Sequence, residues 1–72
     1  MSLRNALLEA IKKHAEGHIE KHRVNVENLL QNTVGVAEHP DHIETIEKEL
    51  GIIAEYDDQL EMLNKYFVKK DP

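Results

Sequence analysis

The chain has 72 residues, enough for one small domain but too few to bury a large hydrophobic core. It has no cysteine, so disulfides cannot stabilise that core, which leaves a metal ion or a partner subunit. The net charge of −5 argues against a general nucleic-acid binder, because such proteins neutralise phosphates with basic side chains. There is no basic-then-apolar leader and no apolar run near the roughly 18 residues that span a bilayer. We therefore expect a soluble cytoplasmic protein with no membrane partner.

A first helix is predicted over residues 2–32. Ser2 is a suitable N-cap, and apolar residues follow at the three- and four-residue steps of a helix. The main stripe contains Leu8, Ile11, Ala15, Ile19, His22, Val26 and Leu30, and its edge contains Leu3, Leu7, His14 and His18. A single partner helix cannot cover so broad an arc. Gly17 lies inside this helix and indicates either a close helix crossing or a tolerated weak point.

A loop is predicted over residues 33–39, where turn-forming residues interrupt the pattern and a few small apolar residues can tuck beneath the chain. The second helix is predicted over residues 40–67, with Pro40 in its first turn and Asp41 and Glu44 at capping-box spacing. Gly51 falls at an outer position of this helix. Its apolar seam contains Ile43, Ile46, Leu50, Ile53, Leu60 and Phe67, with Asp57 and Asn64 as polar members. A polar tail is expected over residues 68–72.

Two amphipathic helices joined by a short loop predict an all-α fold, a single antiparallel two-helix hairpin domain over residues 1–72. The expected register places His22 between Leu50 and Ile53, and His18 near Asp57. Apolar rows on both helices are then left uncovered, which predicts an oligomer interface of Leu3, Leu7, Ile52, Tyr56 and Leu63. A twofold homodimer that forms a four-helix bundle would cover these rows.

Charge is distributed unevenly between the two predicted helices. Residues 1–36 carry five Lys/Arg and four Asp/Glu, whereas residues 37–72 carry four Lys/Arg and ten Asp/Glu. The first half is therefore weakly positive and the second strongly negative. The two halves should attract each other.

Histidines at positions 14, 18 and 22 place three imidazoles along one flank of the first helix. Adjacent members of the row His14, His18 and His22 could share a divalent metal such as zinc, nickel or copper, but the row supplies at most two neighbouring ligands. The other interpretation is that these histidines line a helix interface with carboxylate partners. We expect His18 or His22 to be a pH-sensitive interface residue that faces Asp57 or another seam carboxylate. A cap or solvent role is expected for His39 and His42, beside the loop.

Residues for catalysis are scarce, because the chain has one serine, two threonines and no cysteine. Asp57 and Asp58 are adjacent and diverge by about 100° on a helix, so they cannot act as a convergent acid/base pair. A two-helix hairpin has no concave pocket of its own. We therefore expect no enzymatic activity, no catalytic or cofactor-binding residues and no cofactor.

Four runs of the sequence carry a resemblance to a family. They are Val34-Gly35-Val36-Ala37-Glu38-His39-Pro40-Asp41, Ile43-Glu44-Thr45-Ile46-Glu47-Lys48-Glu49-Leu50, Ala54-Glu55-Tyr56 and Leu60-Glu61-Met62-Leu63. In these runs the chain resembles small helical proteins of marine cyanobacterial phages and ocean metagenomes. The resemblance covers about residues 6–67. It implies a phage-encoded protein in the cytoplasm of a bacterial host. It implies no activity and no functional residues.

Two functions remain open from the sequence. The first is a non-enzymatic homodimeric interaction module that also binds a host protein, with the acidic second helix competing for a basic surface on that partner. The alternative is a small metal-binding or metal-responsive protein built on the histidine row. No reaction or ligand signature decides between them.

Overall fold

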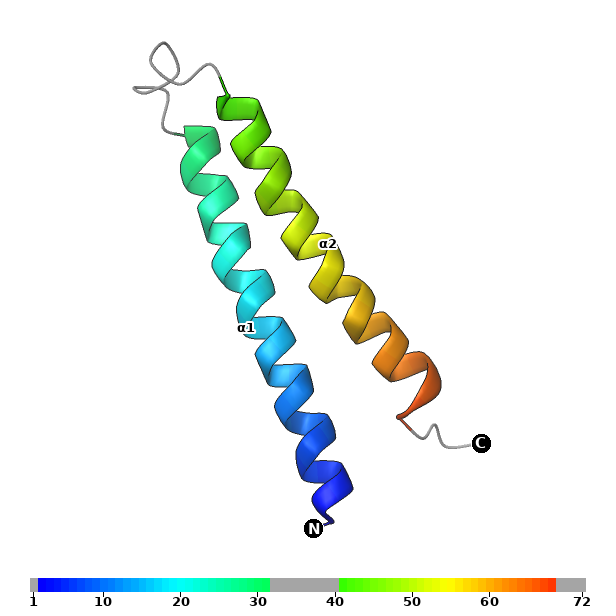
Figure 1. Cartoon of the computed structure of the whole chain (residues 1–72). Helices are drawn as coiled ribbons and strands as arrows, with labels where there is room; N and C mark the ends of the chain where they lie inside the picture. Colours follow the sequence, from blue (N-terminus) through cyan, green and yellow to red (C-terminus); the bar gives the residue numbers. More distant parts are fainter. Residues whose placement is uncertain (1, 32–40, 69–72) are drawn as a thin grey trace.

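Two helices lie side by side and run in opposite directions in the computed structural model, which describes residues 2–31 and 41–68 (Figure 1). Helix α1 spans Leu3–Gln31, and helix α2 spans His42–Tyr66. The start of α1 lies beside the end of α2; we call this the termini end, and the opposite end the connection end. The molecule is elongated, with extents of 54 × 19 × 16 Å. The predicted all-α antiparallel hairpin is confirmed.

The two helices begin differently. The Ser2 hydroxyl oxygen accepts a hydrogen bond from the Asn5 backbone amide at 3.1 Å, so Ser2 is the predicted N-cap of α1. The capping box predicted for α2 is wrong, because the Asp41 side chain makes no cap hydrogen bond. Instead, the Thr45 hydroxyl and the Thr45 amide both donate to the Asp41 carbonyl, at 3.1 and 2.9 Å. Helix α2 therefore begins at His42, two residues later than expected.

The contact between the helices is thin. Among the described residues only Ala15 is fully buried, with 1% of its surface exposed. The half-buried residues among those described are Leu8, His18, Ile19, His22, Asn25, Val26 and Leu29 on α1, and His42, Ile46, Glu49, Ile52, Ile53, Tyr56, Leu60, Met62 and Leu63 on α2. Histidine, asparagine and glutamate thus occupy positions that are usually apolar in a larger core.

The predicted seam of α2 is partly wrong. Three of its members are exposed, Ile43 at 73%, Leu50 at 50% and Phe67 at 56%, and so are the polar members Asp57 and Asn64. The row Ile52, Tyr56 and Leu63, expected to stay uncovered, is half-buried instead. The predicted seam would have placed two unpaired polar side chains in the contact layer, which is costly. The observed face leaves both of them in water.

Neither glycine marks a close helix crossing. A side chain added at Gly17 or Gly51 would meet nothing within 4 Å. Gly17 is therefore a tolerated weak point of α1, and the predicted outer position of Gly51 is confirmed. The predicted loop over 33–39, with its tucked apolar residues and His39, lies outside the described residues, as does the tail from residue 69.

Candidate functional site

The histidine row of α1 forms an aromatic cluster with one tyrosine of α2. The His18 ring stacks on the Tyr56 ring, with centroids 4.6 Å apart and planes 9° apart. His14 meets the edge of Tyr56 at 6.1 Å and lies 4.5 Å from His18. His22 continues the row with its ring parallel to that of His18, at 6.2 Å. The structure therefore brings the three predicted histidines together along the helix contact.

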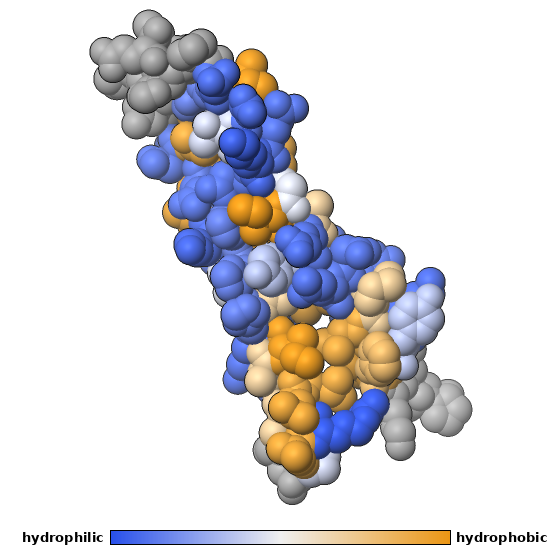
Figure 2. Space-filling model, in the orientation of Figure 1, coloured by the Kyte–Doolittle hydropathy of each residue, from blue (hydrophilic) through white to orange (hydrophobic). Residues whose placement is uncertain are grey.

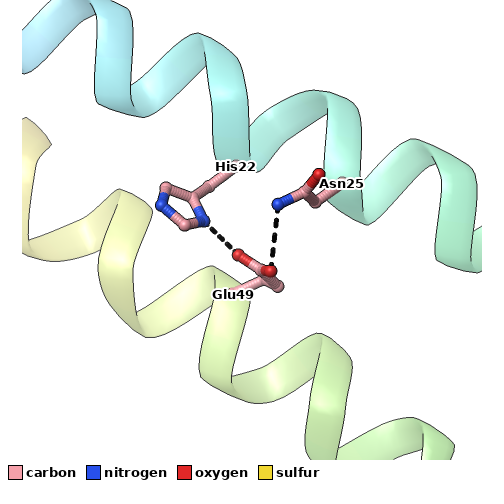
Figure 3. A network of polar contacts seen from close by, with 3 residues as sticks. All are labelled: His22, Asn25 and Glu49. Carbon is pink, nitrogen blue, oxygen red and sulfur yellow. Dashed lines mark hydrogen bonds and ion pairs between the residues drawn. The ribbon is translucent and has the colours of Figure 1, made fainter.

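His22 reaches across the hairpin to a carboxylate (Figure 3). Its Nδ1 donates to Glu49 Oε2, and Asn25 Nδ2 donates to Glu49 Oε1 at 3.1 Å. These hydrogen bonds, chiefly the one from His22, hold the pKa of Glu49 below its ordinary value. His22 does face a carboxylate across the hairpin, but Glu49 lies outside the predicted seam, and the named partner Asp57 is wrong, because Asp57 is exposed.

His18 has no carboxylate partner in this cluster. Desolvation, together with the charges of His14, Lys21 and His22, lowers the pKa of His18 below its ordinary value of 6.5. The neutral ring is therefore favoured, which suits stacking on Tyr56.

Two polar contacts tie the ends of the hairpin. At the connection end, His42 Nε2 donates to the Leu29 carbonyl at 2.8 Å, so the predicted cap role of His42 is confirmed. At the termini end, Arg4 Nη2 donates to the Phe67 carbonyl at 2.7 Å. The sequence interpretation missed Arg4 and Glu49. Glu49 could have been found, since it lies seven residues before Tyr56 and so on the same helix face.

The metal interpretation finds little support in this part of the chain. Among the described residues, no three His, Cys, Asp or Glu side chains are grouped so that they could hold a metal ion. The bond from Nδ1 to Glu49 leaves Nε2 of His22 free, so the row offers His14 with His18 or His18 with His22 as an adjacent pair. Two imidazoles do not complete the four-ligand set of a structural zinc site.

A shallow groove runs along the exposed flank of the histidine row. It has a volume of about 290 Å³ and is lined by Lys13, His14, Gly17, His18 and Lys21. Gly17 contributes no side chain, and the lysines stand four residues before and four after it. We call this set the basic groove, since all of its ionisable side chains are lysines or histidines.

Hydrophobic side chains gather toward the termini end of one face, over the first half of α1 and the second half of α2 (Figure 2). We call this surface the termini patch and assign to it, from their exposure and helical spacing, Leu3, Leu7 and Ile11 of α1 and Leu63 and Tyr66 of α2. Leu3 and Leu7 of the predicted oligomer interface are exposed, whereas Ile52, Tyr56 and Leu63 are half-buried beside α1. The predicted interface residues therefore do not form two uncovered rows. Leu3 and Leu7 are accessible on the surface of α1, whereas the three residues of α2 are already partly covered by α1.

Neither described helix combines the length and the apolar character needed to cross a membrane. Comparisons with protein-family models, curated proteins and solved structures find no match to this chain. The resemblance to phage proteins stays a prediction.

Proposed function

We propose that the chain is a non-catalytic interaction module whose first partner is a second copy of itself, in a four-helix bundle. The observation that carries the proposal is the burial of Ala15 alone among the described residues. One buried alanine gives little hydrophobic free energy against the conformational entropy lost on ordering two long helices. A second copy doubles the apolar contact without new sequence.

The exposed area supports the same proposal. The chain exposes 5943 Å², whereas a compact monomer of 8.3 kDa exposes about 4,600 Å². Its radius of gyration is 16.6 Å, against about 11 Å for a compact chain of 72 residues. A stable dimer hides roughly 600–1,000 Å² on each partner. The surplus area is therefore large enough to supply such an interface.

The termini patch supplies the apolar part of this interface. Leu3, Leu7 and Ile11 recur at four-residue steps, so they share one side of α1. All three are large and exposed, and contiguous patches of this kind mark interaction surfaces more often than scattered single residues do.

A binding role also fits the chemistry of the surface. The basic groove is shallow and has no nucleophile beside a base. We further propose, from the phage resemblance, a bacterial host protein as a later partner of the dimer. The acidic face of α2 suits a basic surface on that protein.

Sedimentation equilibrium at micromolar concentration tests the dimer. We expect a mass of about 17 kDa, twice the 8.3 kDa of one chain. Leu7→Glu should return the mass to that of one chain, because it places a charge in the termini patch, while circular dichroism should keep its helical signal. Leu7 is a better target than Tyr56, since Tyr56 also stacks on His18 inside the hairpin.

Leu30→Glu is the matched control. Leu30 is as exposed as Leu7, 58% against 55%, but lies about 140° round α1 from it, because the two are 23 residues apart. This variant should stay dimeric. A wild-type chain that sediments as a monomer and still melts sharply would refute the proposal.

A further inference from the structure

We infer that the second copy docks with its connection end beside the connection end of the first, so that Glu55 of each copy lies over the basic groove of the other. This inference rests on the proposed dimerisation and specifies its geometry. It follows from the position of the termini patch, the charges of the two helices and the register between them.

The termini patch occupies only one end of the hairpin, and the other end of the same face is mostly hydrophilic, with a few scattered hydrophobic side chains (Figure 2). A twofold axis parallel to the helices brings the two patches together. A perpendicular axis through the middle of the hairpin would lay each patch on the hydrophilic half of the other copy. Burial of apolar area therefore selects the parallel axis.

The parallel axis also decides which helices meet. Rotation about it places α1 of one copy against α2 of the other. Helix α1 carries five Lys/Arg and four Asp/Glu, whereas α2 carries two Lys and seven Asp/Glu. A perpendicular axis, even one that passes through the termini patch, would place α2 against α2 and bring like charges together. Charge complementarity thus selects the same arrangement.

The register between α1 and α2 fixes the height of each contact, that is, its position along the helix axis. Three contacts cross the hairpin, Arg4 with Phe67, His22 with Glu49 and Leu29 with His42, and in each pair the residue numbers add up to 71. An axis parallel to the helices keeps residues at the same height in both copies. Residues 54 and 55 of the second copy therefore lie level with Gly17 of the first.

Of these two residues, Glu55 has a charge opposite to that of the groove and a suitable position on α2. Glu55 is exposed and follows Ile52 by three residues, so the two are neighbours on the flank of α2 that faces the second copy. The groove offers Lys13 and Lys21 on either side of a glycine that leaves room for a carboxylate. The twofold symmetry forms this contact twice.

Charge reversal tests the contact. Glu55→Lys should weaken the dimer at least about tenfold, because it sets a lysine between two others. Adding Lys13→Glu and Lys21→Glu to the same chain should restore the dimer. Glu47→Lys is the control, since it makes the same charge change on the outer flank of α2. Equal effects of Glu55→Lys and Glu47→Lys would overturn the contact.

Energy transfer between labels tests the orientation. The chain has no cysteine, so Glu47→Cys and Lys65→Cys each give one labelling site. These exposed positions lie on the same helix flank, 18 residues or about 27 Å apart. Transfer from 47 in one copy to 47 in the other should exceed transfer from 47 to 65.

The outcomes separate the two proposals. A dimer by sedimentation in which the 47-to-65 transfer is larger would overturn this orientation and leave the proposed function standing. A wild-type monomer would overturn both. Restored dimerisation in the triple variant, together with stronger 47-to-47 transfer, would support the docking geometry.

Discussion

Replacing Ala15 with leucine tests whether the helix contact is as close as the structure indicates. Ala15 is the one fully buried residue among those described, so the three added carbon atoms of a leucine would have to push against the facing helix. Overpacking a closed site costs about 1–3 kcal/mol. A small domain of this size has roughly 3–5 kcal/mol of stability in all. Ala15→Leu should therefore remove a large part of the free energy of unfolding.

The assay is urea and thermal unfolding followed by circular dichroism, at one fixed protein concentration so that association contributes equally. A loss of 2 kcal/mol should lower Tm by roughly 8–16 °C in a domain of this length. Ala54→Leu is the control, because Ala54 is exposed, lies about 160° round α2 from Ile52, and leucine has a similar helix propensity. It should change stability by less than about 0.5 kcal/mol. If Ala15→Leu behaves like Ala54→Leu, the helices do not close over this position.

Three further predictions concern the glycine of α2 and the two polar clusters. Gly51→Ala should raise the free energy of unfolding by about 0.5–1 kcal/mol in the same urea melts, since the added methyl meets nothing within 4 Å; a loss of stability would contradict the open surroundings of this glycine. The folded pKa of Glu49 lies below its ordinary value of 4.5, so its contribution is complete above pH 4.5 and is lost as the pH falls through the folded value. Glu49→Gln should therefore flatten the acid slope of the unfolding free energy, and an unchanged slope would remove the His22 and Asn25 contacts from the explanation. Desolvation of the His18 ring, which stacks on Tyr56 of α2, and then the charges of His14, Lys21 and His22 on α1 lower the pKa of His18, so the unfolded chain binds more protons below pH 6.5 and stability falls on acidification from there. His18→Gln should reduce that loss between about pH 7.5 and pH 5.5, whereas the exposed Asp57→Asn should retain it; the reverse result would return Asp57 to the contact.

The helices themselves could be predicted from local information. Apolar residues at helical steps, a serine cap and an interrupted pattern between the two periodic segments depend on neighbours a few residues apart. The bounds of α1 and α2 differ from the predicted ones by one or two residues, the usual uncertainty at helix ends. The histidine row is local too, because residues four apart always share a helix flank.

The facing surface of α2 was decided only by the tertiary structure. Two overlapping faces compete on this helix, one with Ile43 and Leu50 and one with Ile52 and Tyr56, while Ile46, Ile53 and Leu60 serve either. Both faces carry apolar residues at three- and four-residue steps, so the periodicity of α2 does not distinguish between them. The choice depends on what α1 offers at the same height, which a pattern within α2 does not contain.

What α1 offers is polar. His22 and Asn25 bind Glu49, and His18 stacks on Tyr56, so turning α2 to this face satisfies a carboxylate and an aromatic ring. The other face would have brought Asp57 and Asn64 against the same histidine row without comparable geometry. The sequence alone determined two amphipathic helices and their antiparallel order, whereas their rotation about their own axes was decided by side-chain partners more than twenty residues apart, because a buried polar group must find its hydrogen bond wherever the fold supplies one.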